Sequence, residues 1–458
     1  MKAKEKEVQQ RVDSALKNVD TTKSVIIGSG ALDSVTQCLT QHFDGKPALV
    51  IADTNTFKAA GRQVMQHMVS LGYPVLEPFI FDSNGLYAEI TYVEQLQSYL
   101  AGKELVPIAV GSGTINDITK LASGRCSLAY MSVATAGSMD GYTAFGASIS
   151  YKGAKQTFEC KAPLAVVADI GVIAAAPREM NASGYADLIA KIPSGADWIV
   201  ADALGIEPID KVAWELTQTH LRSMVSNPSG ILSADHDAMP GLMEGLIMTG
   251  LGMQVSKTSR PASGAEHQFS HLWDNQHHTY QGAAPSHGFK VGIGSLSSEA
   301  LYEMILRKDA GDFDASPETI MKQWPSFSQI ECQIREYFQD KELAEQTVAQ
   351  SRAKYVTAQQ LVERIQLLKA VWPQLKEKLR TQLLGAGQMQ QMLALAGAPT
   401  HPEQIGISSE RLKLSYRQAQ LIRQRYTILD LVLETNGWAD CVDPLFADNG
   451  FWTKTISY

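Results

Sequence analysis

Short apolar segments alternate with helix-like segments over residues 23–173. The apolar segments are bounded by turn residues and predict strands at 24–28, 48–52, 74–79, 107–110, 128–133 and 164–169. Between them, residues 61–71 and 90–100 carry apolar positions at steps of three and four, the spacing of helices that cover a sheet. Such alternation is typical of strand–crossover–strand units. The pattern therefore predicts an α/β domain with a mostly parallel sheet over residues 1–173.

Beyond residue 174 the strand pattern almost disappears, and apolar residues recur with helical spacing. This spacing predicts helices at 182–192, 211–224, 239–253 and 296–306. Residues 328–384 are polar with a thin apolar stripe, which favours a long solvated helix or helix pair used for packing or oligomer contacts. We therefore expect an all-α domain over residues 174–458.

Length and charge narrow the class of protein. A chain of 458 residues exceeds the size at which one hydrophobic core stops growing, so two domains are expected. The net charge of −8, with no basic stripe, argues against nucleic-acid binding and favours a small-molecule partner. The chain has no apolar run of about 20 residues, so we expect no membrane span, and its polar first residues lead us to expect no secretory signal. Its five scattered cysteines favour a reducing, cytoplasmic location without disulfides.

Two glycine turns are candidates for phosphate binding. The first, Gly28-Ser29-Gly30, has Asp33 where a dinucleotide fingerprint has its third glycine, so a turn-only role is equally open. The second is stronger, because Gly111, Ser112, Gly113 and Thr114 join a buried strand directly to a helix that continues through Asp117. Free backbone N–H groups at such a helix start can hold a pyrophosphate. The alternative is a tight turn with Thr114 as the helix cap.

Asp53 ends the second predicted strand, where an acid commonly binds the adenosine ribose. A carboxylate there would repel a 2'-phosphate and favour NAD(H) over NADP(H). Asp53 could equally cap the helix that follows, and both roles stay open.

A possible metal site combines Asp187, early in an apolar helix, with His267 and His287. One carboxylate and two imidazoles leave a coordination position open, as a catalytic zinc, iron or nickel ion needs. His271 shares the helical face of His267 and is a rival ligand on spacing alone. On residue types alone, these histidines could also be ordinary core or surface residues.

Taken together, these motifs resemble the glycerol-1-phosphate dehydrogenase family, within the group that includes glycerol dehydrogenases, iron-containing alcohol dehydrogenases and dehydroquinate synthases. The resemblance covers residues 24–294 and, more loosely, 428–435. Its motifs lie at residues 111–120, 135–142, 184–191, 263–273 and 286–292. Gly137, Ala144, Ala186 and the tail 436–458 depart from the usual pattern, which bears more on substrate identity than on the fold.

The resemblance implies a Rossmann-like nicotinamide-dinucleotide-binding domain over residues 1–173 and an all-α metal and substrate domain over residues 174–458. It also implies a dehydroquinate synthase-like arrangement of the two domains, with a substrate cleft between them. It places NAD(H), possibly NADP(H), at Asp53, Gly111, Ser112, Gly113, Thr114, Asp117, Thr135 and Ser138. It also implies one divalent metal, zinc, nickel or iron, on Asp187, His267 and His287. These three residues and Asp140 are the expected catalytic residues, and Asp140, Lys191 and His271 are expected to face the substrate.

The implied reaction is the reversible reduction of dihydroxyacetone phosphate to sn-glycerol 1-phosphate by a homo-oligomer, a dimer or larger. The metal would polarise the ketone as a Lewis acid while the cofactor supplies hydride. Cations near the motifs could bind the phosphate: Lys155, Lys191, Arg260 and Lys290. Three alternatives remain: a dehydrogenase of glycerol or another unphosphorylated polyol, a dehydroquinate synthase-like cyclase, and a non-catalytic nucleotide-binding protein.

Overall fold

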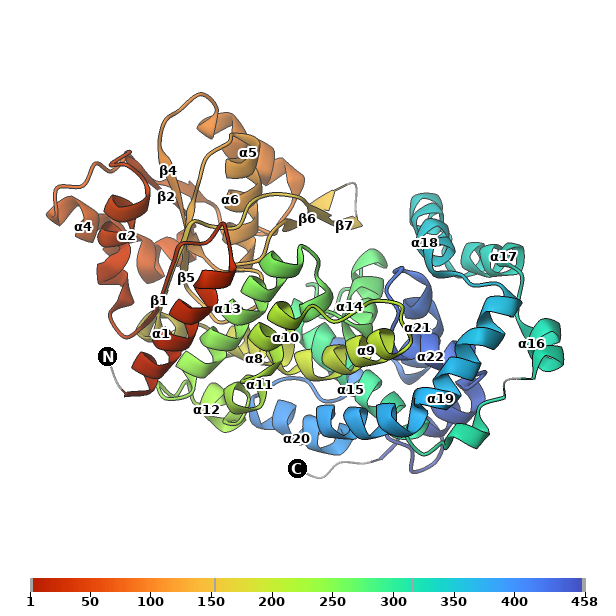
Figure 1. Cartoon of the computed structure of the whole chain (residues 1–458). Helices are drawn as coiled ribbons and strands as arrows, with labels where there is room; N and C mark the ends of the chain where they lie inside the picture. Colours follow the sequence, from red (N-terminus) through yellow and green to blue (C-terminus); the bar gives the residue numbers. More distant parts are fainter. Residues whose placement is uncertain (1–2, 152–153, 315, 455–458) are drawn as a thin grey trace. The chain divides into compact units, whose positions relative to one another are not determined.

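The structure is a computed structural model that describes residues 3–151, 154–314 and 316–454, and Figure 1 traces the chain. Two compact units interleave along the sequence. Unit 1 comprises Met1–Ile189, Asp210–Ala262 and Leu395–Ala398, and unit 2 comprises Ala190–Ile209, Ser263–Ala394 and Pro399–Tyr458. Unit 1 thus contains the predicted sheet together with helices from beyond residue 173. The functional division at residue 173 stays a prediction.

Unit 1 is built on a parallel six-stranded sheet with the strand order β1-β8-β5-β4-β2-β3. The strands are β1 (Ser24–Gly28), β2 (Ala48–Asp53), β3 (Phe79–Phe81), β4 (Val106–Gly111), β5 (Met131–Ala134) and β8 (Ala165–Asp169). The predicted α/β class with a parallel, Rossmann-like sheet is confirmed.

Helices cover both faces of this sheet because its strands bury side chains on each side. Along β2, Val50 and Ala52 pack into one hydrophobic cluster, while Leu49 and Ile51 pack into another. The first cluster includes side chains of two helices on one face, and the second includes those of two helices on the other. Figure 1 shows these two pairs of helices on opposite sides of the strands. These pairs are α2 (Val35–His42) with α4 (Arg62–Ser70), and α5 (Ile90–Leu100) with α6 (Gly113–Arg125).

The third strand and a hairpin differ from the sequence prediction. The strand expected at 74–79 is instead β3 at Phe79–Phe81, preceded only by an isolated bridge between Ala48 and Val75. Pro74 and Pro78 lack the N–H that a sheet ladder needs, so regular pairing starts after them. The prediction also missed an antiparallel hairpin of β6 (Ala147–Tyr151) and β7 (Ala154–Phe158).

The remaining helices of unit 1 include one that the sequence analysis did not predict. Helix α1 (Ala3–Ala15) buries Val8 and Val12, and Arg11 forms an ion pair with the buried Glu244. Glu244 lies on α13, so this ion pair fixes the first helix to the longest helix of the unit. The others are α3 (Thr54–Thr56), α7 (Ile170–Ala174), α8 (Arg178–Ile189), α10 (Lys211–Gln218), α11 (Leu221–Met224), α12 (Pro228–Leu232) and α13 (Met239–Ser256).

Unit 2 is helical in its described part, as predicted for the C-terminal region. Its helices are α9 (Lys191–Ala203), α14 (Ala265–Asn275), α15 (His287–Ile305), α16 (Pro317–Gln323), α17 (Phe327–Tyr337), α18 (Lys341–Lys354), α19 (Ala358–Gln382), α20 (Ala386–Leu395), α21 (Ser409–Leu421) and α22 (Ile428–Glu434). The polar stretch 328–384 is three helices, not one or two, because Asp340 and Thr357 each cap a new helix start. Within the described chain, no helix combines the length and apolar character required to cross a membrane.

Candidate active site

A cleft of about 530 Å³ opens where strands β2, β4 and β5 end. Asp53, Ser112, Thr114 and Thr135, all predicted to bind the cofactor, line it together. Because the strands are parallel, their carboxyl ends meet at one edge, which is where ligands bind in such sheets. The cleft therefore brings four of the predicted cofactor residues into one place.

The turn between β4 and α6 is suited to an anion. A side chain at Gly111 would place its Cβ 2.5 Å from the Cβ of Ile115, so only glycine fits at the end of this strand. Ser112 is the N-cap, and its side chain makes no hydrogen bond to the helix. The alternative that Thr114 caps the helix is thus wrong. The first turn of α6 has no side-chain cap from Ser112, and Ser112 and Thr114 line the cleft. Phosphate binding at a helix start uses such free N–H groups.

Asp53 does cap the short helix α3, since its Oδ1 accepts hydrogen bonds from the backbone N–H groups of Asn55 at 2.8 Å and Thr56 at 3.0 Å. It also lines the cleft. The two roles left open by the sequence are therefore compatible, because a capping carboxylate still has a second oxygen.

The other predicted cofactor residues are not among those that line the cleft. A Cβ added at Gly113 would lie 3.2 Å from the side chain of Met139. Ser138 precedes Met139 in the same loop. Asp117 is on α6, where its carboxylate lies 3.8 Å from the ammonium of Lys120. Burial raises the pKa of Asp117, an effect that Lys120 and Lys155 oppose. The weaker Gly28–Gly30 turn follows β1, an edge strand of the sheet, and Gly30 adopts a left-handed turn with φ of 74°.

The loop after β5 lies directly against α8, which carries Asp187. An added Cβ on Gly184 would lie 1.8 Å from the carbonyl oxygen of Gly137, so the absence of a side chain permits this approach. The backbone N–H of Asp140 donates a hydrogen bond of 3.1 Å to Oδ2 of Asp187. Asp187 is fully buried, and this bond helps to fix its carboxylate. Asp140 thus lies beside the predicted metal ligand.

His267 is oriented by its neighbour Glu266. The Nδ1 atom of His267 lies 2.9 Å from Oε1 of Glu266, which also accepts the backbone N–H of Gly264 at 2.6 Å. When a carboxylate accepts the Nδ1 proton, the tautomer leaves Nε2 with a lone pair for a metal. A Cβ added at Gly264 would collide with Asp197 and Glu266, and one added at Gly294 would collide with Glu266. These two glycines therefore allow α14 and α15 to pack closely.

His287 begins α15, after the N-cap Ser286. Its Nδ1 lies 3.4 Å from the hydroxyl of Ser270, and its ring centroid is 5.3 Å from that of His267. Helix α14 thus contributes one histidine and an orienting hydroxyl, and α15 contributes the other histidine.

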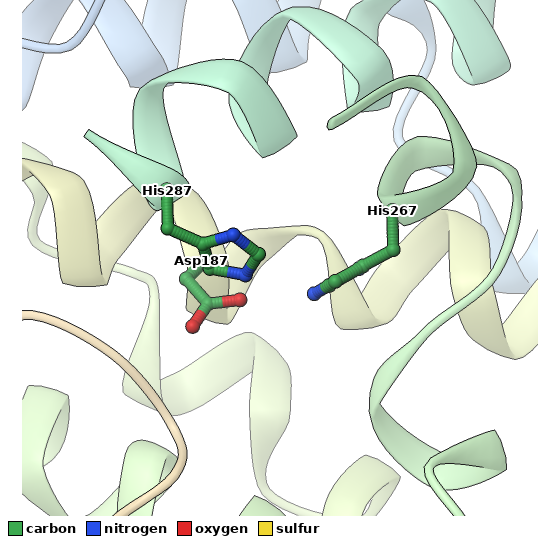
Figure 2. A group of neighbouring side chains, drawn as sticks. All are labelled: Asp187, His267 and His287. Carbon is green, nitrogen blue, oxygen red and sulfur yellow. The ribbon is translucent and has the colours of Figure 1, made fainter. Parts of the chain in front are cut away.

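Asp187, His267 and His287 form a group whose possible ligand atoms all lie within 4.8 Å of one another. Figure 2 shows the three side chains pointing toward one another. Zinc takes nitrogen and oxygen ligands of these kinds, imidazole nitrogens and carboxylate oxygens. The donor set of two imidazoles and a carboxylate also fits a catalytic metal with an open position.

His271 belongs to the same neighbourhood but not to this group of ligand atoms. Its ring centroid lies 6.1 Å from that of His267 and 6.2 Å from that of His287. His271 thus lies beside the group, and its substrate-facing role stays a prediction.

The four predicted phosphate anchors differ in their surroundings. Lys290 is buried and forms an ion pair with Asp274, which reduces its capacity to bind a phosphate. Lys191 starts α9 and is completely buried, as is Arg260, while Lys155 lies on β7. Of these, Lys191 stays the predicted substrate residue.

Sequence reasoning missed several residues that support the site, among them Glu266 and Asn181. Glu266 had one available signal, since it is an acid next to a candidate ligand in the first turn of a helix. Asn181 had no such signal in the sequence, because its side chain accepts a hydrogen bond of 2.9 Å from the backbone N–H of Gly137, 44 residues earlier. Contacts of this kind depend on the tertiary fold.

Comparisons with known proteins agree with this arrangement. The family model of iron-containing alcohol dehydrogenases matches residues 26–177. A glycerol-1-phosphate dehydrogenase [NAD(P)+] of Halalkalibacterium halodurans is 36% identical over 58% of this chain and 67% of its own length. The same enzyme of Geobacillus stearothermophilus is 29% identical over 89% of this chain and 91% of its own.

Among solved structures, the glycerol dehydrogenase of Schizosaccharomyces pombe matches with a TM-score of 0.58 and 16% identity, covering 92% of this chain and 91% of that one. At this identity, the likeness concerns the fold. The helical region after the sheet also matches, because the similarity extends over nearly the whole chain. On the sequence similarity, the chain belongs to the glycerol-1-phosphate dehydrogenase family of metal-type, iron-containing alcohol dehydrogenase-like oxidoreductases.

Proposed function

We propose that this protein reduces dihydroxyacetone phosphate to sn-glycerol 1-phosphate, reversibly, with NADH or NADPH and one divalent metal. The observation that carries the proposal is the convergence of Asp187, His267 and His287 in a chain related to glycerol-1-phosphate dehydrogenases. A cleft at the carboxyl edge of the sheet, lined by Ser112 and Thr114, supports the cofactor assignment.

The cofactor and metal would supply the hydride and Lewis-acid chemistry. The protein's own residues provide the geometry. Glu266 holds the tautomer of His267, and the Asp140 backbone holds Asp187, so the two ligands are oriented before anything binds. The uncapped first turn of α6 would hold the pyrophosphate, and Asp53 would bind the ribose.

Substrate-facing roles for Asp140, Lys191 and His271 rest on family resemblance and belong to the proposal. Lys191 is the assigned phosphate partner because the resemblance places it in the substrate site. A phosphate dianion that is removed from water needs such a cation, since burying it unpaired is costly. The homo-oligomer and the cytoplasmic location stay predictions.

Initial rates test the proposal directly. The protein is reconstituted with zinc, nickel or iron and assayed with NADH and NADPH on dihydroxyacetone phosphate and on dihydroxyacetone. If the phosphate orients the ketone, its removal lowers kcat as well as weakening binding. We expect kcat/KM to favour dihydroxyacetone phosphate by at least about tenfold, a difference of ~1.4 kcal/mol.

Each alternative has its own outcome. Equal or higher efficiency with dihydroxyacetone would overturn the phosphate assignment and identify a polyol dehydrogenase. A cyclase would give no net NADH consumption with a simple ketone. A non-catalytic nucleotide-binding protein would retain no metal and show no turnover with any of these substrates.

A further inference from the structure

Lys120 is a buried lysine on α6 that the proposed chemistry does not use. Its side chain is only 1% exposed, and its ammonium donates to three backbone carbonyls: Gly141 at 2.8 Å, Ala144 at 3.0 Å and Gly146 at 3.1 Å. Three bonds are the full donor capacity of an ammonium group. The carboxylate of Asp117, one turn earlier, lies 3.8 Å away and partly balances the charge. A buried charge held this completely fixes the backbone that it contacts.

The three carbonyls that Lys120 contacts belong to the loop between β5 and β6, residues 135–146. Thr135 of this loop lines the cofactor cleft, and Asp140 donates its N–H to Asp187. Gly141, which Lys120 contacts, directly follows Asp140. The loop has no regular secondary structure of its own, so its shape depends on contacts from neighbouring elements.

Contacts from other helices hold the rest of this loop. Asn181 of α8 accepts the N–H of Gly137 at 2.9 Å, and the hydroxyl of Thr143 donates to the carbonyl of Ile247 on α13 at 2.8 Å. The Lys120 contacts come from α6, whose first turn lines the cofactor cleft. Six residues separate Thr114 from Lys120, a rise of about 9 Å along the helix. One rigid helix therefore joins the cofactor turn to the loop that supports Asp187.

We propose that Lys120 is a positioning residue, which fixes the loop 135–146 so that Asp140 and the metal ligand Asp187 keep their geometry relative to the cofactor turn. This inference rests on the proposed function for its catalytic consequence. Its consequence for metal binding can be measured without any substrate. A lysine that only stabilised the fold would affect the amount of folded protein and leave the folded molecules' metal affinity unchanged.

Lys120→Met tests this directly because it keeps the length of the side chain and removes its charge and its donors. Zinc affinity is measured on folded protein by competition with a chelating dye, and NADH binding by fluorescence. We expect zinc affinity to fall at least about tenfold, the usual effect of losing support for a metal ligand, and kcat to fall by a similar factor. NADH affinity should change less than about threefold. Lys46→Met, at an exposed lysine of the same unit, is the matched control and should behave as the wild type.

Two further variants keep the test decisive if Lys120→Met does not fold. Lys120→Gln retains an amide donor and should fold with a smaller loss of zinc affinity, and Lys120→Arg, which retains the charge, should recover part of it. Wild-type zinc affinity in folded Lys120→Met or Lys120→Gln would overturn the proposal. Zinc binding decides this even if dihydroxyacetone phosphate is not the substrate.

Discussion

The close approach of the loop 135–146 to helix α8 makes Gly184→Ala a severe test of the site geometry. The new Cβ would lie 1.8 Å from the carbonyl oxygen of Gly137, whereas real Cβ atoms essentially never approach a heavy atom within 3.0 Å. The obstacle is backbone, which cannot rotate away as a side chain can. The loop must therefore move by at least 1.2 Å, the difference between these two distances.

The expected cost follows from three contributions. Overpacking of this kind costs about 1–3 kcal/mol, and alanine recovers about 1 kcal/mol of helix propensity. Loss of the Asp140 hydrogen bond to the Asp187 carboxylate adds about 1.5–3 kcal/mol. We expect a net destabilisation of about 3 kcal/mol. Because a displacement of about 1 Å at a reacting group can lower a rate ~100-fold, kcat should fall by about that factor.

Urea denaturation and initial rates measure the two effects. Gly387→Ala is the matched control, because this exposed helical glycine has no heavy atom within 4 Å of an added Cβ. It should be neutral or gain up to about 1 kcal/mol and keep its full rate. If Gly184→Ala had wild-type stability and kcat, the contact between α8 and the loop would be wrong, and with it the reason that Asp140 lies beside Asp187.

Three further predictions concern separate contacts. Glu266→Gln should weaken zinc binding by about 10–100-fold, because an amide holds His267 less firmly in the required tautomer; dye competition measures it, and unchanged affinity would exclude the orienting role. Asp53→Gly should narrow the preference for NADH over NADPH by removing a charge that repels the 2'-phosphate, and an unaltered ratio of kcat/KM values would show that this residue does not contact the ribose. Arg11→Met should cost about 3 kcal/mol in urea denaturation, since it leaves the buried Glu244 without its ion-pair partner, whereas a loss below about 0.5 kcal/mol would refute the anchoring of α1.

Sequence patterns predicted most of the sheet because its central strands are short apolar runs between turns, such as Ala48–Asp53 and Val106–Gly111. They failed where pairing depends on partners distant in sequence. The third strand begins after Pro78, where it pairs with β2. Helix α1 is too polar to be predicted from its own sequence, because its partner Glu244 lies more than 200 residues after Arg11. The motif at Gly111–Thr114 could be interpreted because one local turn contains its chemistry.

The candidate metal site shows the same limit. Residue types and family resemblance suggested Asp187, His267 and His287, but spacing alone could not choose between His267 and His271. The structure separates them, because Glu266 orients His267, and the grouped ligand atoms in the described chain come from His267 rather than His271. Supporting residues such as Asn181 and Lys120 have no local sequence signal, since their partners lie in another element.

The proposed function depends most on one assignment, that Asp187, His267 and His287 hold a single divalent metal. The most direct measurement is the metal content of wild type, His267→Ala and His271→Ala after zinc loading and gel filtration, by elemental analysis. The two variants remove the same side chain from the same helix, four residues apart. We predict about one zinc per chain in the wild type and in His271→Ala, and almost none in His267→Ala, because a three-ligand site cannot retain its ion after losing an imidazole. Zinc retained by His267→Ala and lost from His271→Ala would contradict the assignment.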